Sequence, residues 1–220
     1  MGALEDGRKQ LLAVHDGFRE SELSWQELLE DLKRQGLELG PKLAVGEGGM
    51  GFWAALRKVY PATREQRCWL HKTANVLNKL PRSMQGKAKQ ALRNIYLAES
   101  RQTAEDALDR FKNLYKKKFL KAVECLEKDR QVLLAFYDFP AGHWGHLRTT
   151  NPIESTFATV RLRQRRTKGC GSREASLTMV FMLARPPERH WRRLNGSEVI
   201  VHVLDGKQFK DGLMVQENAA

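Results

Sequence analysis

Three glycines and one carboxylate fall together in the stretch LAVGEGGMGFWAAL, residues 43–56. Gly46, Gly48 and Gly51 fit the G-x-G-x-x-G spacing, which lets a backbone loop cradle the pyrophosphate of a dinucleotide. Glu47 lies inside the same loop, directly after a short apolar run. The stretch therefore offers two chemistries: a nucleotide loop built on backbone N–H groups, or a carboxylate presented at the end of a strand.

The nucleotide interpretation lacks its other parts. A dinucleotide loop normally occupies the first strand-to-helix turn of a parallel unit, and an acid ends the next strand. Here the loop follows what reads as the third strand, and Glu65 begins the next strand instead of ending it. We therefore expect no nucleotide cofactor, and titration with NAD or ATP would decide the question.

A second carboxylate, Glu154, lies in TTNPIEST, in the first turn of an expected helix that leads into the acid-free segment VRLRQRRTKGCGSR. The glycines beside Glu47 would let a DNA phosphate approach closely. Carboxylates from separate elements can hold the paired ions of two-metal phosphoryl transfer, and Mg²⁺ prefers such oxygen ligands. Glu47 and Glu154 are therefore the candidate catalytic and metal-binding residues. A solvated loop glutamate is the alternative for Glu47.

The positive charge of the chain is concentrated near this second carboxylate. The chain carries a formal net charge of +12. Residues 141–195, a quarter of the chain, hold eleven Lys and Arg and three Asp and Glu, a net of +8. Such a segment is typical of a phosphate-backbone contact, and a solvated basic face is the alternative. The candidate DNA-binding residues are Arg148, Asn151, Arg161, Arg163, Arg165, Arg166, Lys168 and Arg173.

The elements that must position these residues follow from periodicity and turn residues. The first 75 or so residues read β-β-α-β-α-β, with a hairpin at Asp6-Gly7 and REQRCWLH as the last strand. In the helix SELSWQELLEDLKRQG, Ser24 and Glu27 form a possible capping box and Gly36 a stop. From Thr73 to about Tyr137 the apolar residues recur at helical spacing only. We expect an α/β fold with a helical segment inserted.

Composition excludes several classes of protein. No apolar run is long enough to cross a membrane, and the first residues show no signal peptide, so a cytoplasmic location is expected. Cys68, Cys125 and Cys170 are odd in number and widely spaced, which argues against a disulfide framework. Cys68 and His71 could join His143 and His146 as four zinc ligands. The two pairs are about seventy residues apart, however, and we do not expect zinc.

Two long stretches together resemble one known family: VGEGGMGFWAALRKVYPATREQRCWLHKTANVLNKLP and YDFPAGHWGHLRTTNPIESTFATVRLRQRRTKGCGSR. They are similar to the Mutator-type transposases of bacterial insertion sequences, and the resemblance runs from about residue 2 to residue 212. It implies a ribonuclease-H-like domain with an all-helical insertion before the last catalytic acid. It also implies a D-D-E triad that holds two Mg²⁺ (or Mn²⁺) ions and cuts and joins DNA at the element's inverted repeats.

The family pattern, carried over residue by residue, is matched in part. Glu154 lies where the family has its catalytic glutamate, and Glu47 where it has its second aspartate. The strand that should carry the first aspartate, and the DNA-binding region before it, have no counterpart in this sequence. Asp16 resembles a substitute, but only a helix and a strand separate it from Glu47 where the family has two strands and a helix, so we interpret it as a polar residue at a strand end. Cys68 and His71 match the family's C-x-x-H near the active site, and we expect His71 to contact DNA or steady the site and Cys68 to have a packing role.

The resemblance implies four regions: residues 1–75, the first part of a ribonuclease-H-like domain without its first strand; 76–145, the helical insertion; 146–195, the catalytic-glutamate helix and basic segment; and 196–220, a tail. Pro186-Pro187 should break a helix that is continuous in the family. We therefore expect a truncated transposase, defective in DNA cleavage and strand transfer. The alternative is a non-catalytic DNA-binding protein that modulates an intact transposase. Expected partners are DNA and either a second copy or an intact transposase, at the bacterial nucleoid.

Overall fold

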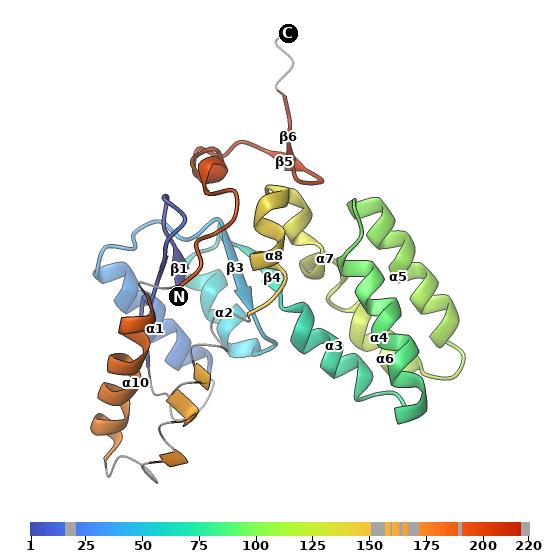
Figure 1. Cartoon of the computed structure of the whole chain (residues 1–220), viewed down its shortest axis with the longest axis horizontal. Coiled ribbons are helices and arrows are strands. Elements are labelled where there is room, and N and C mark those ends of the chain that lie inside the picture. The colour runs from blue at the N-terminus through green and yellow to red at the C-terminus, as the bar shows by residue number, and fades with distance from the viewer. Residues whose placement is uncertain are drawn as a thin grey trace. The chain divides into compact units, whose positions relative to one another are not determined.

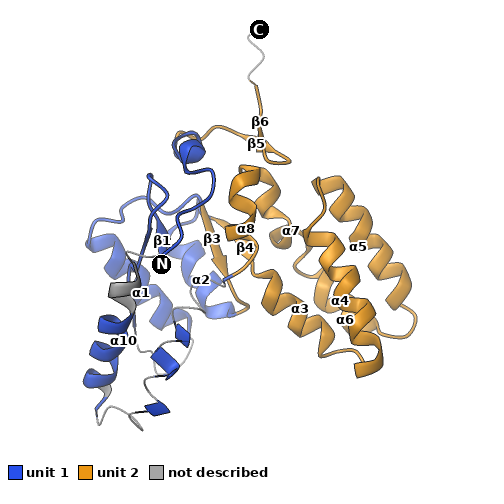
Figure 2. Ribbon diagram, viewed as in Figure 1, with its two compact units in different colours: residues 1–42, 49–63, 150–204 blue, residues 43–48, 64–149, 205–220 orange. Residues whose placement is uncertain are grey.

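The structure is a computed structural model that describes residues 1–15, 21–150, 157–158, 160–162, 165–166, 172–188 and 191–216. Short strands and helices share the first part of the chain, helices follow, and a short strand pair lies near the end (Figure 1). Two compact units divide the chain, and each unit is assembled from separated segments (Figure 2). Unit 1 comprises residues 1–42, 49–63 and 150–204, and unit 2 comprises 43–48, 64–149 and 205–220. The four regions expected from the sequence stay predictions.

Unit 1 opens with a small antiparallel hairpin. β1 (Gly2–Ala3) pairs with β2 (Lys9–Gln10), and Gly7 turns the chain between them with a φ of 79°. A positive φ is the conformation that glycine adopts at no steric cost, which is why Asp-Gly marks such turns. The predicted hairpin at Asp6-Gly7 is therefore confirmed, although its strands are only two residues long.

The next element of unit 1 is α1 (Glu22–Arg34), which packs on α2 (Met50–Val59). Ser21 caps α1, because its hydroxyl oxygen accepts the backbone N–H of Ser24 at 3.2 Å. The expectation that Ser24 is the cap was wrong by three residues. Gly36 does end the helix, with a φ of 110°, and the Leu37 N–H returns to the Leu32 carbonyl at 3.0 Å.

Unit 2 contains the one parallel strand pair among the described residues. β3 (Leu43–Gly46) and β4 (Arg64–Arg67) run side by side, with Leu43 opposite Arg64 and Gly46 opposite Arg67. The last predicted strand was too long, because α3 (Trp69–Leu77) begins two residues after Arg67. The order β-β-α-β-α-β is nevertheless confirmed. The strands of the described residues form three separate two-stranded sheets.

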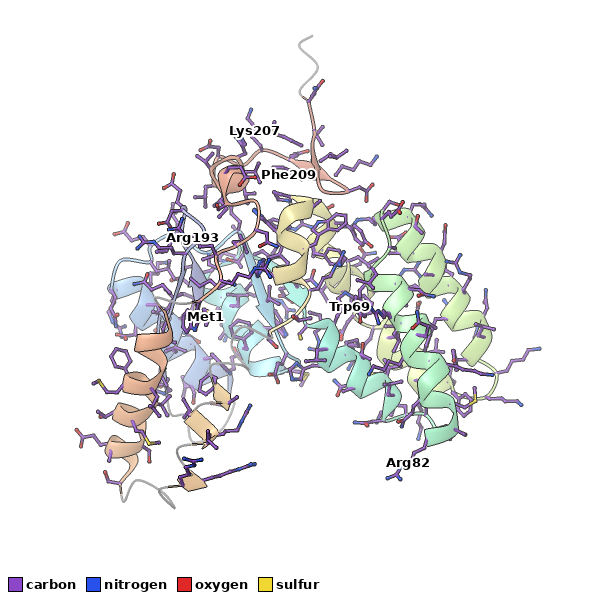
Figure 3. The ribbon with its side chains drawn as sticks, viewed as in Figure 1. Met1, Trp69, Arg82, Arg193, Lys207 and Phe209 are labelled. Atoms are coloured by element: carbon purple, nitrogen blue, oxygen red, sulfur yellow. The ribbon has the colours of Figure 1, made fainter. Side chains whose placement is uncertain are left out.

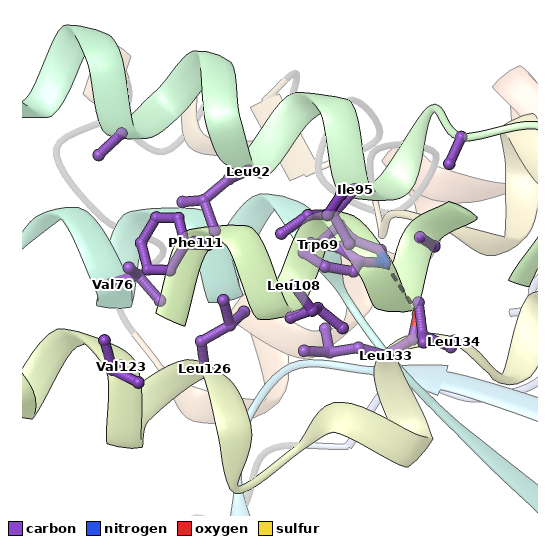
Figure 4. Packing of buried hydrophobic residues seen from close by; sticks show 14 of the residues in the cluster. Trp69, Val76, Leu92, Ile95, Leu108, Phe111, Val123, Leu126, Leu133 and Leu134 are labelled. Atoms are coloured by element: carbon purple, nitrogen blue, oxygen red, sulfur yellow. Dashed lines mark hydrogen bonds between the residues drawn. The ribbon is translucent and has the colours of Figure 1, made fainter. Parts of the chain in front are cut away.

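Helices make the core of unit 2, and this confirms the helical periodicity read from residue 73 onward. They are α3, α4 (Arg82–Tyr96), α5 (Arg101–Tyr115), α6 (Leu120–Glu127) and α7 (Arg130–Leu133). Leu92, Ile95 and Leu108 are fully buried, and Trp69 and Phe111 are 1% exposed (Figure 4). The indole N–H of Trp69 donates to the Leu133 carbonyl at 2.8 Å, so the first turn of α3 is fixed to the end of α7.

Shorter elements complete the described chain. Unit 2 continues with η1 (Ala135–Asp138), η2 (Ala141–His143), α8 (Trp144–Leu147), β5 (Phe209–Lys210) and β6 (Leu213–Met214). Unit 1 continues with α10 (Arg173–Glu188), η3 (Ser197–Val199) and α11 (Ile200–Leu204). Within the described residues, no helix has the length and apolar character needed to cross a membrane.

Helix α10 corrects one expectation. The helix includes both Pro186 and Pro187 and ends at Glu188, so it is not broken before the prolines. Both prolines fall in the last turn. The N–H groups they lack would have bonded only the carbonyls of the preceding turn, and the helix ends one residue later. The expectation that Pro186-Pro187 breaks this helix was therefore wrong.

Candidate functional site

Glu47 and Cys68 lie at the same edge of the parallel strand pair. Glu47 directly follows β3, and Cys68 directly follows β4. Parallel strands end at a common edge, and here the Cys68 N–H donates to the Gly46 carbonyl at 2.8 Å. Cys68 is fully buried and forms the N-terminal cap position of α3. The C-x-x-H spacing therefore places the histidine one turn into a helix that begins at this edge.

His71 contacts both Glu47 and Cys68. Its Nε2 lies 3.2 Å from Glu47 Oε1, and its Nδ1 lies 3.3 Å from Cys68 Sγ. A carboxylate can only accept a hydrogen bond, so in the neutral imidazole Nε2 carries the proton. Nδ1 is then the acceptor for the Cys68 thiol. The contact lets His71 hold the Glu47 carboxylate, and whether His71 steadies a catalytic site or contacts DNA stays a prediction, as does the packing role of Cys68.

The Arg67 side chain packs closely against the backbone at Gly48, beside Glu47. An ideal Cβ at Gly48 would come within 2.0 Å of Arg67 Nη2, so glycine at 48 permits this close approach. The Arg67 side chain is only 11% exposed, and its Nε lies 3.4 Å from Asp129 Oδ2. Glu47, in contrast, is 57% exposed. A mostly buried guanidinium thus lies against a loop whose carboxylate is largely exposed.

Asp129 joins this arrangement to a buried lysine. Lys72 is fully buried, its Nζ forms an ion pair with the Asp129 carboxylate, and it donates to the Cys125 carbonyl at 2.8 Å. Burial lowers the pKa of Lys72, and the hydrogen bond to Asp129 opposes that shift. Sequence reasoning missed Arg67, Lys72 and Asp129. The available signal was Lys72 itself, a cation on the apolar face between Trp69 and Val76 of α3.

Arg148, a candidate DNA-binding residue, is partly engaged inside unit 2. Its guanidinium carbon lies 4.8 Å from the Phe136 ring centroid and 5.3 Å from that of Trp144. The backbone carbonyl of Arg148 accepts the backbone N–H of Trp69 at 2.8 Å. Desolvation lowers the pKa of Arg148. These contacts give the residue a packing role, and its contact with DNA stays a prediction.

The basic segment is described in part, in unit 1. Arg161, Arg165 and Arg166 are helical and exposed, as a phosphate-contacting segment requires. Arg173 is the first residue of α10, and its side chain lies outside the described part. The remaining calls on Asp16, Asn151, Glu154, Arg163 and Lys168 also lie outside the described residues.

The next feature of this edge is its supply of atoms that could bind a metal ion. Glu47 offers the carboxylate oxygen that Mg²⁺ prefers. Among the described residues, no three His, Cys, Asp or Glu side chains come together as possible metal ligands, and this applies also to the set Cys68, His71, His143 and His146. The described residues alone therefore do not make a complete divalent-metal site. The role of Glu154 as a second carboxylate stays a prediction.

Comparison with known proteins shows the family of the chain. The model of the family described as "Transposase, Mutator family" matches residues 1–193. The transposase for insertion sequence element IST2 of Acidithiobacillus ferrooxidans is 54% identical over 213 residues, which are 97% of this chain and 72% of that protein. The transposase for IS6120 of Mycolicibacterium smegmatis is 49% identical over 98% of this chain and 67% of that protein. The transposase for IS905 of Lactococcus lactis is 33% identical over 70% of this chain and 39% of that protein. The chain therefore belongs to the Mutator family of transposases.

Proposed function

We propose that this chain acts in DNA transposition as a transposase of a bacterial insertion sequence, with DNA at the element ends and the target as its substrate. Family membership carries this proposal, since the relatives that cover most of the chain are named as transposases for insertion sequence elements. The exposed arginines Arg161, Arg165 and Arg166 support it, because arginines on a helix can contact DNA phosphates.

For the fold, we propose a ribonuclease-H-like domain with the helices of unit 2 as its insertion. The β3–α2–β4 order and the parallel pairing of β3 with β4 support this. Glu47 and Glu154 are the proposed catalytic acids and Mg²⁺ (or Mn²⁺) ligands, and the ions would stabilise charge on the reacting phosphate. His71 is a proposed positioning residue, because it holds the Glu47 carboxylate through Nε2. The working unit would be an oligomer, either of this chain or with an intact transposase.

For the polypeptide of residues 1–220 tested by itself, we propose DNA binding without cleavage. Among the described residues, no three possible metal ligands come together, and a Glu47 oxygen lies 3.2 Å from His71 Nε2. Two-metal phosphoryl transfer requires several carboxylates around the ions. Such a polypeptide could still modulate an intact transposase by occupying its DNA.

The test is a nicking assay on labelled DNA that carries the element's inverted repeats, with Mg²⁺ or Mn²⁺ added. The expected result is binding in a gel-shift assay and no nicking above the level of the Glu154→Gln variant. If metal-dependent nicking occurs and both Glu47→Gln and Glu154→Gln abolish it, the chain is a competent transposase and the non-cleaving part of the proposal is wrong. If the polypeptide neither binds nor cuts this DNA, the proposed function itself is refuted.

A further inference from the structure

Two turns of unit 2 carry lysines and arginines with no acid between them. Residues 78–87 comprise the connection from α3 to α4 and the start of α4, and they contain Lys79, Arg82 and Lys87. Residues 115–123 comprise the end of α5, the connection to α6 and the start of α6, and they contain four lysines, at 116, 117, 118 and 121. Neither stretch contains Asp or Glu. All seven cationic side chains are exposed. We refer to them together as the basic end.

The packing of the helices brings these two turns to one end of the helix bundle. α4 and α5 are joined by a short connection, so the first turn of α4 and the last turn of α5 lie at the same end. α3 and α6 also pack against each other, and Val76 near the end of α3 lies beside Phe111 and Val123 (Figure 4). The amide of Gln85 donates to the carbonyls of Leu77 and Leu80, which ties the first turn of α4 to the end of α3.

In the described part of the chain, the cations of the basic end have no carboxylate partner, which they share with the cations Arg93, Arg110, Lys128 and Lys210 but not with six others of unit 2. Six other cations form ion pairs with carboxylates of the same unit: Arg64, Arg67, Lys72, Arg101, Lys112 and Arg130. Among the described residues, no carboxylate lies within ion-pair distance of any cation of the basic end. Three of its lysines are consecutive, so their like charges repel one another. A bound polyanion would relieve the free energy cost of that repulsion.

The surface between these cations is also suited to close contact. Gly86 lies inside α4, where glycine costs about 1 kcal/mol relative to alanine, and an added Cβ would meet nothing within 4 Å. Packing within the chain therefore does not require glycine at this position. A smooth backbone surface between Arg82 and Lys87 does fit a partner that approaches closely. Arg82 projects outward from the start of α4 (Figure 3).

We infer that the basic end is a DNA-backbone contact surface on the helical part of the chain, in addition to the arginines of residues 161–173. The inference rests on the proposed function, because it takes the DNA handled by a transposase as the partner. Phosphate charges along a duplex match a cluster of mobile ammonium groups without base recognition, so the contact is independent of sequence. α3 links it to the candidate site, since the nine residues from Trp69 to Leu77 span about 13 Å.

The experiment measures binding of the 220-residue chain to a fluorescent duplex of about 30 base pairs over a range of salt concentrations. Variant A replaces Lys116, Lys117, Lys118 and Lys121 with Gln. Variant B removes the same charge elsewhere in unit 2, through Arg93, Arg110, Lys128 and Lys210 to Gln, all of which are exposed. Variant C replaces Arg161, Arg165 and Arg166 with Gln. Thermal melting of each variant checks that these surface changes leave the fold intact.

We expect variant A to weaken binding at least tenfold at low salt and to make the slope of log K against log salt shallower by about 2 to 4, since each phosphate contact contributes about 0.9. Variant B should change affinity less than threefold. In the wild type, DNA should protect the four lysines of variant A from acetylation and leave Lys128 and Lys210 reactive.

The outcomes separate this inference from the proposed function. If A and B weaken binding equally and acetylation of the four lysines is unchanged by DNA, the basic end is only a solvated face and the inference is wrong. If variant C weakens binding in that same experiment, the proposed function stands without the inference. A wild-type chain that binds no duplex at any salt concentration overturns both.

Discussion

At the scale of single residues, Gly48 and Arg67 decide how the Glu47 loop is held. We predict that Gly48→Ala lowers the free energy of unfolding by about 1–3 kcal/mol, the usual cost of overpacking. The added methyl would lie 2.0 Å from Arg67 Nη2, so the guanidinium would have to shift, and its ion pair with Asp129 and its 11% exposure oppose that shift. Urea unfolding followed by circular dichroism measures the change. Gly86→Ala is the matched control and should stabilise the protein by about 0.5–1 kcal/mol, because its Cβ meets open space inside a helix.

Equal effects of these two alanine substitutions would contradict the prediction. In that case Arg67 would move aside at little cost, and the loop would not depend on it. The outcome matters for function, because a loop fixed by a buried guanidinium presents its carboxylate in one place. A loop that tolerates alanine at 48 would present Glu47 in many positions.

Tyr137 is the residue whose ionisation the fold perturbs most clearly. Its hydroxyl donates to the Ala98 carbonyl at 2.9 Å, and burial raises its pKa from 10.0 to about 12. The unfolded chain therefore loses this proton first. The stabilisation is fully present below about pH 10 and is lost as the pH rises to about 12. A shift of this size corresponds to ~2–3 kcal/mol.

We predict that stability falls between pH 10 and about 12 and that Tyr137→Phe removes most of this fall. The variant should also be less stable than the wild type at pH 7, because the Ala98 carbonyl loses its donor. Urea unfolding at several pH values from 7 to 12 tests both statements. A variant with the same alkaline loss as the wild type would show that other groups cause it.

At the scale of elements, one carboxylate fixes β4, α3 and α7 together. Asp129 lies at the N-terminal cap position of α7 but makes no side-chain cap there, because its carboxylate meets Lys72 and Arg67 instead. We predict that Asp129→Asn costs about 3–5 kcal/mol, because it leaves the Lys72 ammonium buried without its counter-charge. Glu124→Gln, at an exposed position of α6, should change stability by less than about 0.5 kcal/mol. Calorimetry of both variants gives the comparison, and a cost below 1 kcal/mol for Asp129→Asn would mean that Lys72 finds another partner.

Local patterns predicted the elements better than their ends or their contacts. The apolar residues of α4 and α5 recur at helical spacing, and the same residues form the core. The start of α1 was misplaced because Ser21 and Ser24 are both good caps, and only the folded chain selects one. The strand predicted at 64–71 ended early because Trp69 turns into the helix to bond Leu133, a contact 64 residues away. Sequence spacing carries no information on such partners.

The candidate site shows the same division. The glycine loop marked Glu47, and the C-x-x-H spacing marked Cys68 and His71. Parallel pairing of β3 with β4 then explains why the three residues meet. Arg67 and Asp129 could not be predicted, because their roles depend on how α7 packs against β4. The pairing of Glu47 with Glu154 stays a prediction.

At the scale of the whole molecule, composition and organisation give different kinds of information. The net charge of +12 indicates a polyanion partner but does not locate the contact. The contact can be located only from the folded structure. Two acid-free turns that are separated by about 30 residues in sequence form one surface only when the helices pack. The family assignment was available from long motifs alone. The division into two units, each built from separated segments, was not.

The two units should also differ in local stability. The cluster of buried apolar residues lies in unit 2, where Leu92, Ile95 and Leu108 are fully buried on α4 and α5. Unit 1 contains the β1–β2 hairpin, whose strands have two residues each, and such a pair is marginal by itself. Amides in the core helices exchange with solvent only through large-scale unfolding, whereas short hairpins open locally.

We predict that hydrogen exchange is slowest in peptides from α4 and α5 and at least a hundredfold faster in peptides covering residues 1–12. Mass spectrometry of exchanged peptides measures both, and the Asp129→Asn variant should accelerate α4 and α5 while leaving residues 1–12 unchanged. Equal rates in the two regions would show that the whole chain opens as one cooperative unit, and the Asp129 cluster would then stabilise the entire molecule rather than unit 2.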